Sequence, residues 1–310
     1  MRRRRKYDFY LVVFLTILTV GYFTYNHMSA ESRGVENYSE ALEAYKSSDY
    51  EKAYEEFAKV PSGSTLKPSA LFRQARCATN MDKKELAIKK YNRIVHSSVK
   101  SSIAPISEYN MANLMFEIQD KGAKKHFKKI IKKYPTSDYA VASNYYLGLI
   151  EVSNPPKSER WLKKSKNRAF IYFKNYLEEA PDGRFALKTI DEIKKLGVQL
   201  TNYDNLLIAK SYYANGEYTK AKDYLNKTTL AESWSDFAKN EYKLGNKEKA
   251  NYYAELGLKK HASNTPNADV YEVIDNYIAS FPLRRDGIIK LNSLGLNSTG
   301  ADYAAYLNCN

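Results

Sequence analysis

Lysines recur through residues 121–168 at a spacing that could create an anion-binding surface. This segment holds thirteen basic residues against three acidic ones. Its apolar residues Ala123, Phe127 and Ile130 recur every three to four positions and predict the buried face of a helix. The lysines would then occupy the opposite face, and further cations follow before the next predicted helix. The candidate anion- or partner-binding residues are Lys124, Lys125, Lys128, Lys129, Lys132, Lys133, Lys163, Lys164, Lys166 and Arg168.

Two interpretations of this lysine-rich face stay open at the level of the sequence. Clustered lysines create a positive surface potential that attracts anions. Candidate anions are lipid headgroups, anionic wall polymers, stem-peptide carboxylates or an acidic partner. The same lysines could instead form a solvated face that only keeps the protein in solution.

Catalytic chemistry has little support among the remaining polar residues. Cleavage of a glycosidic bond needs a carboxylic acid of raised pKa beside the leaving oxygen. The Glu-Ser pairs of the chain are Glu31-Ser32 and Glu232-Ser233. We interpret Glu232 as a helix-start residue, where a carboxylate suits the helix dipole. The serines show no pattern with His and Asp that would indicate nucleophilic catalysis. We therefore expect no catalytic residue and no enzymatic activity in this chain.

Cofactor and metal sites are not expected either. The four histidines are scattered, whereas a zinc site needs three or four converging ligands. The chain has no glycine-rich phosphate-binding motif. Two cysteines, Cys77 and Cys309, are too few for an exported disulfide scaffold, and the sequence does not show whether they pair. We expect Cys77 to be buried in a helix, and Trp161 and Trp234 to be packing residues.

A repeated pattern predicts the elements that position these side chains. An alanine is followed one helical turn later by a large residue, and each alanine lies shortly after a turn signal. The small residue lets two helices approach closely, and the large one fills the groove beside the contact. One such hairpin cannot bury its apolar face alone, whereas stacked hairpins form a solenoid. The predicted packing residues are Ala53, Phe57, Ala87, Tyr91, Ala123, Phe127, Ala169, Phe173, Ala221, Leu225 and Ala250.

This spacing resembles the tetratricopeptide repeat (TPR), whose second helix carries Ala-x3-Phe and ends near a proline. Tyr134-Pro135 and Ala180-Pro181 look like the junctions between hairpins of that family. Successive alanines lie 34, 36, 46, 52 and 29 residues apart, so the array is irregular. The resemblance implies an all-α fold, a TPR-like right-handed α-solenoid of about six to seven hairpins over residues 37–310. An insertion is predicted at residues 154–165.

A second resemblance covers residues 130–310. The order of Tyr134-Pro135, Pro181–Arg184, Phe281–Gly287 and Ala301-Asp302-Tyr303 is similar to the superhelical region of soluble lytic murein transglycosylases. This resemblance implies a non-catalytic superhelix that guides an enzyme on murein or docks it there. The Glu-Ser motif and the following segments that the family uses for catalysis are not found together in this chain. Whether the chain belongs to a longer lytic enzyme stays open.

The N-terminus predicts export and membrane anchoring. Four arginines and Lys6 precede an apolar run of 17 residues without charge, Phe9–Tyr25. A basic segment before such a run is typical of a signal anchor or a cleaved signal peptide, and the run is near the lower limit for a membrane span. The positive-inside rule places the basic segment in the cytoplasm. The predicted segments are a cytoplasmic basic region at 1–6, a transmembrane signal anchor at 7–26 and a linker at 27–36.

These expectations lead to one main functional hypothesis and two alternatives. The main one is a membrane-anchored, extracytoplasmic scaffold for protein–protein interaction in the bacterial cell envelope. The first alternative is the non-catalytic superhelix of a lytic transglycosylase. The second is a module that binds anionic wall polymer or lipid through the lysine-rich helix. Expected partners are envelope proteins or peptidoglycan, and the export signal argues against nucleic acid.

Overall fold

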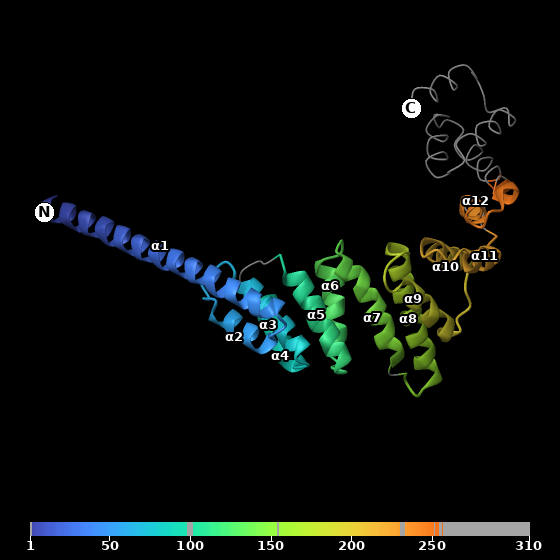
Figure 1. The fold of residues 1–310 in the computed structure, drawn as a ribbon, viewed down its shortest axis with the longest axis horizontal. Coiled ribbons are helices and arrows are strands. Elements are labelled where there is room, and N and C mark those ends of the chain that lie inside the picture. Colours follow the sequence, from blue (N-terminus) through green and yellow to red (C-terminus); the bar gives the residue numbers. More distant parts are fainter. Residues whose placement is uncertain are drawn as a thin grey trace, which may run out of the picture. The chain divides into compact units, whose positions relative to one another are not determined.

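The computed structural model describes residues 2–97, 102–153, 155–229, 233–250, 252–253 and 256. All regular secondary structure in these residues is helical, which confirms the predicted all-α class (Figure 1). The chain divides into two compact units, Met1–Ser153 and Asn154–Asn310.

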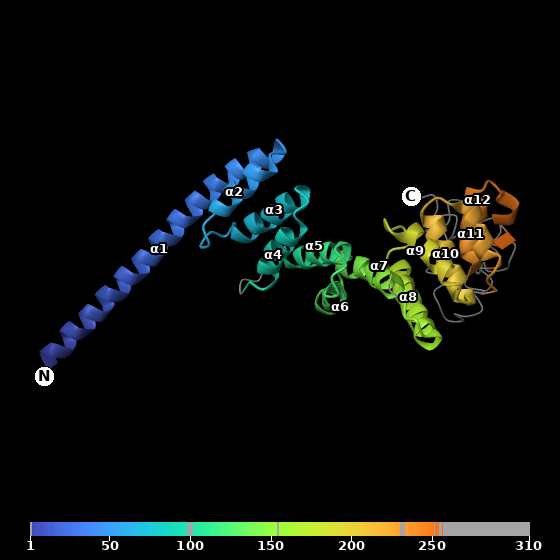
Figure 2. The same ribbon diagram turned by 90° about the horizontal axis from the view of Figure 1, so that it is seen from below.

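Unit 1 is a succession of antiparallel helical hairpins, in which each helix packs against the next one along the chain. Helix α5 also contacts α7, so that neighbouring hairpins share a contact. Packing between near neighbours is typical of stacked repeats. Figure 2 shows this succession from below. The helices are α1 (Arg2–Lys46), α2 (Tyr50–Lys59), α3 (Lys67–Asn80), α4 (Lys84–Val95), α5 (Ala104–Glu117), α6 (Ala123–Lys133) and α7 (Asp138–Ser153).

Unit 2 follows the same principle with one additional helix. Helix α8 contacts both α9 and α10, α10 pairs with α11, and α11 contacts α12. Helix α9 coincides with an extra helical stretch after the junction at Pro181, and it lengthens the interval between Ala169 and Ala221. The helices are α8 (Glu159–Glu179), α9 (Ala186–Leu196), α10 (Asn202–Ala214), α11 (Tyr218–Leu225) and α12 (Trp234–Lys243).

The structure buries every predicted packing residue. The six alanines of the pattern are at most 2% exposed, and Phe57, Phe127 and Phe173 are fully buried. Tyr91 and Leu225 are each 2% exposed. Cys77 is also fully buried, and burial raises the pKa of its thiol to about 11. The alanine positions therefore lie where two helices approach each other.

The predicted linker at residues 27–36 is instead part of α1, which continues without a break to Lys46. The segment is helical because it packs on the loop after α2. Ala30 is buried there, and the Glu31 carboxylate accepts a hydrogen bond from the Thr65 backbone N–H at 2.8 Å. Gly34 faces Ser64 so closely that an added Cβ would lie 2.3 Å from the Ser64 Oγ. We call Ala30, Glu31 and Gly34 with Ser64 and Thr65 the α1 dock.

The first part of α1 runs clear of the other helices of unit 1 (Figures 1 and 2). The described residues include no helical stretch with the length and apolar character that a membrane span requires. The side chains of residues 1–12 and of residues 23, 26 and 27 lie outside the described part of the predicted anchor.

The predicted insertion at 154–165 overlaps the start of α8, which begins at Glu159 and is 21 residues long. One further expectation turns out differently in the structure. Trp161 is not a packing residue, because it lies near the start of this long helix and is 53% exposed, with the Lys164 ammonium 4.9 Å from its ring centroid. Trp234, in contrast, stacks on Tyr253 at 5.8 Å. Glu232, Phe281–Gly287, Ala301–Tyr303 and Cys309 lie outside the described residues.

Candidate functional site

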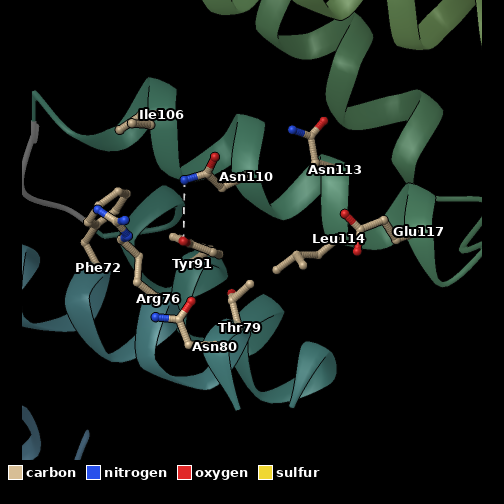
Figure 3. Close-up of a pocket in the computed structure, with 10 residues that line it drawn as sticks. All are labelled: Phe72, Arg76, Thr79, Asn80, Tyr91, Ile106, Asn110, Asn113, Leu114 and Glu117. Atoms are coloured by element: carbon tan, nitrogen blue, oxygen red, sulfur yellow. Dashed lines mark hydrogen bonds between the residues drawn. The ribbon is translucent and has the colours of Figure 1, made fainter. Parts of the chain in front are cut away.

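A groove of about 430 Å³ lies between α3 and α5 in unit 1 (Figure 3). Most of its lining is polar, and the polar side chains come from one face of each helix. Arg76, Thr79 and Asn80 share a face of α3 because they are three and four residues apart. Asn110, Asn113 and Glu117 share a face of α5 for the same reason. The full lining is Phe72, Arg76, Thr79, Asn80, Tyr91, Ile106, Asn110, Asn113, Leu114 and Glu117.

Tyr91 of α4 forms a fixed wall of this groove. Its side chain is 2% exposed, and its hydroxyl accepts a hydrogen bond from the Asn110 Nδ2 at 3.4 Å. The ring of Phe72 packs edge-on against the Tyr91 ring at 5.6 Å. Burial raises the pKa of Tyr91, so the phenol stays protonated and neutral. Tyr91 is thus both a repeat-packing residue and part of the groove.

The groove offers hydrogen-bonding groups that the fold itself does not use. The side-chain oxygen of Asn113 is buried and accepts no hydrogen bond. A buried acceptor without a partner costs about 1–3 kcal/mol, and rotation of the Asn113 side chain into the groove would present this oxygen to an N–H group of a ligand. Arg76 is exposed, and its guanidinium carbon lies 5.8 Å from the Tyr45 ring centroid. Glu117 is held by an ion pair with Lys84 at 3.1 Å.

Sequence reasoning missed Arg76, Asn110 and Asn113 as site residues. A signal was present, because polar residues follow the helical spacing on both α3 and α5. A polar helix face in a sequence usually indicates contact with solvent, however, and the two faces come from separate helices. Only the packing of α3 and α5 around Tyr91 turns them into one groove.

The lysines of α6 fall into two groups. Lys124 lies 2.6 Å from the buried carboxylate of Glu151 on α7, and Lys129 lies 2.7 Å from the buried carboxylate of Glu108 on α5. His126 Nδ1 also lies 3.1 Å from Glu108. Burial acts to raise the pKa of Glu108, but the hydrogen bonds from His126 and Lys129 outweigh it and lower the pKa. These two lysines therefore neutralise carboxylates that are buried in the interior of unit 1.

The other predicted cations are divided between two helices, α6 of unit 1 and α8 of unit 2. Lys125, Lys128, Lys132 and Lys133 are exposed on α6, and the Lys133 ammonium lies 5.0 Å from the Tyr134 ring centroid. The remaining four belong to α8 of unit 2. There, Lys163 and Lys164 are exposed, Arg168 is half-buried, and Lys166 donates a hydrogen bond to the Leu196 carbonyl at 3.1 Å.

Comparison with protein families places the groove within a known kind of repeat. Residues 69–100, 107–137 and 205–229 match the tetratricopeptide repeat. The described hairpins are tetratricopeptide-like repeats. The first two matched segments contain α3–α4 and α5–α6, so the groove lies between the first helices of two consecutive TPR-like hairpins. The third contains α10–α11 in unit 2. No curated protein sequence matches the chain.

Three solved structures are similar to this chain at low sequence identity. A tetratricopeptide repeat protein from Parabacteroides merdae is 16% identical, with 80% of this chain and 98% of that chain covered and a TM-score of 0.37. The C-terminal part of a TPR repeat-containing protein from Cytophaga hutchinsonii is 17% identical, with 82% and 99% covered and a TM-score of 0.35. The TPR2AB-domain:pHSP90 complex of yeast Sti1 is 15% identical, with 80% and 98% covered and a TM-score of 0.33. A resemblance to lytic murein transglycosylases is not shown by these comparisons.

Proposed function

We propose that this chain is a protein–protein interaction scaffold that holds an extended segment of a partner protein in the α3–α5 groove. The observation that carries the proposal is the mostly polar lining, with the Asn113 amide among it, of a groove between two TPR-like hairpins. Polar side chains that form few hydrogen bonds within the fold are suited to a ligand that supplies both donors and acceptors.

The chemistry of the lining fits a peptide main chain. An extended peptide presents an N–H and a C=O at each residue, and a side-chain amide can pair with both kinds of group. Asn80, Asn110 and Asn113 supply such amides, while Ile106 and Leu114 supply apolar contact. The groups stand on helices that are packed before binding, so little ordering is required when the ligand arrives.

We further propose that residues 7–26 anchor the scaffold in the cytoplasmic membrane, with the body on the extracytoplasmic side of the cell envelope. The charge asymmetry of the N-terminus supports this topology. Exposed apolar side chains also surround α1, since Leu15, Leu18 and Val20 are 51%, 53% and 58% exposed. A helix that is apolar on all sides needs an apolar environment. Protease added to cells with a permeable outer layer should digest the body, and protection in intact protoplasts would refute the topology.

The groove can be tested with a photo-crosslinking amino acid at position 80, introduced into the full chain in cells. The crosslinked partner segment is mapped by mass spectrometry, synthesised as a peptide and titrated against the purified full chain in a non-ionic detergent. Asn113→Leu should weaken binding at least tenfold, because it removes the buried acceptor. Asn92→Leu is the matched control, since Asn92 is exposed on α4 and does not line the groove. Equal affinities of the two variants would refute the proposed site.

A further inference from the structure

Lys125, Lys128 and Lys132 form a row of positive charges on α6 that the fold does not neutralise. They are three and seven residues apart, so they share one face of the helix over about 10 Å. All three are exposed, and none of their ammonium groups makes a hydrogen bond or an ion pair with the described residues. We call these three residues the α6 stripe.

Within the described residues, no acid of the neighbouring helices is paired with the stripe, and Asp138 at the start of α7 is exposed. Glu108 of α5 and Glu151 of α7 are buried, and they are paired with the inner lysines Lys129 and Lys124. Asp120 lies before the N-terminus of α6, where its carboxylate accepts a hydrogen bond from the Gly122 N–H at 2.7 Å. The inner lysines therefore balance the buried acids, and the charges of the stripe stay available to an outside partner.

The composition of the exposed face distinguishes between kinds of partner. The exposed positions of α6 are all lysines, namely the stripe and Lys133. Protein interfaces favour aromatic residues and arginine and are poor in lysine. Helices that lie on membranes carry exposed Trp, Phe or Leu beside their lysines. A surface of lysine alone has neither property, and therefore fits a partner that is recognised mainly by its charge.

The lysine ammonium is a compact point charge, and it binds phosphate groups in this form. We propose that the α6 stripe docks a phosphodiester-linked anionic polymer of the cell wall. The choice of a wall polymer over nucleic acid rests on the proposed extracytoplasmic position of the body. The stripe lines no part of the α3–α5 groove, so the two surfaces can be tested separately.

The proposal is tested with fluorescently labelled poly(glycerol phosphate) and the full chain in a non-ionic detergent. Lys125→Gln/Lys128→Gln/Lys132→Gln should weaken binding at least tenfold. The slope of log affinity against log salt should become shallower by about 2, because three contacts to a single-stranded polyanion are lost. The matched control is Lys52→Gln/Lys89→Gln/Lys188→Gln, which removes three exposed lysines outside the candidate anion-binding set. An equal loss in both triple variants, or no loss in either, would overturn the proposal.

Three further probes test the chemistry and the source of the polyanion. Polyglutamate of matched charge separates phosphate from carboxylate, and equal or tighter binding of polyglutamate would overturn the proposed phosphodiester ligand. Single-stranded DNA or anionic phospholipid vesicles that bind more tightly than poly(glycerol phosphate) would overturn the choice of a wall polymer. Asn113→Leu should bind the polymer like the unaltered chain. Loss of peptide binding in the groove and loss of polymer binding on the stripe can therefore be distinguished by these variants.

Discussion

The Glu108 carboxylate on α5 lies 2.7 Å from the Lys129 ammonium on α6, so that a buried acid on one helix of a hairpin is neutralised from the other. The Glu108 side chain is fully buried, whereas the Lys129 side chain is 38% exposed. The lysine thus reaches the acid from the solvent side. The same arrangement recurs as Lys124 with Glu151, Lys174 with Asp204 and Lys222 with Glu241.

Removal of the Lys129 ammonium should destabilise unit 1. In Lys129→Met the Glu108 carboxylate keeps only His126 as a hydrogen-bond partner among the described residues. We expect a loss of about 1–2 kcal/mol, because a buried charged group loses a partner while the partly exposed ammonium is screened by solvent. Chemical denaturation of the full chain measures this loss. Lys128→Met, one position earlier on the exposed face, should leave stability unchanged, and an equal effect of both variants would contradict the pairing.

Stability should fall in acid. Burial acts to raise the pKa values of Glu108, Asp204 and Glu241, but hydrogen bonds from the paired lysines and neighbouring groups outweigh it and lower them. A carboxyl whose pKa is lower in the folded state stabilises the fold above its ordinary pKa, and this contribution is lost as the pH falls through the folded value. The thermal midpoint should therefore be steady from pH 7 to about pH 5 and decrease below about pH 4. A midpoint that is unchanged down to pH 3 would show that these pairs add no stability.

Enlargement of a repeat alanine should disrupt the contact between paired helices. Ala123 and Ala169 are 2% and 0% exposed. Replacement of either by leucine should overpack the contact and cost about 1–3 kcal/mol. Ala58→Leu is a control within α2, because Ala58 is exposed. The midpoint of thermal unfolding by circular dichroism distinguishes these variants, and unchanged midpoints in both buried variants would mean that the hairpin packing is different.

Two glycines of α1 should respond in opposite ways to alanine. A Cβ at Gly34 would lie 2.7 Å from the Ser64 Cβ, whereas a Cβ at Gly21 meets nothing within 4 Å. Gly34→Ala should therefore cost about 1–2 kcal/mol, because overpacking exceeds the gain in helix propensity. Gly21→Ala should cause no loss. The second change Ser64→Gly should restore the stability of Gly34→Ala, and failure of this rescue would contradict the α1 dock.

The hairpin pattern was visible in the sequence because helix pairing is governed by local spacing. Ala123 and Phe127 must share a helix face whatever the rest of the chain does. The sequence could not show which lysines form ion pairs. Lys124 and Lys129 differ from Lys125 and Lys128 only because acids on other helices lie beside them. The groove could not be predicted for the same reason, since Asn80 and Asn113 line it from two different helices. The helical state of residues 27–36 depended on the loop after α2, which no local signal indicates.

The unbroken course of α1 has a mechanical consequence. A helix of 45 residues is about 68 Å long, and the α1 dock joins its second half to the first hairpin. A flexible tether would let the body explore a wide volume and would absorb a pull by stretching. A continuous helix instead fixes the distance from its N-terminal end to the hairpin, and a pull along its axis loads the contact between Gly34 and Ser64 in shear. The first hairpin is therefore held at a fixed distance from the N-terminal end of α1, and a flexible linker would not fix this distance.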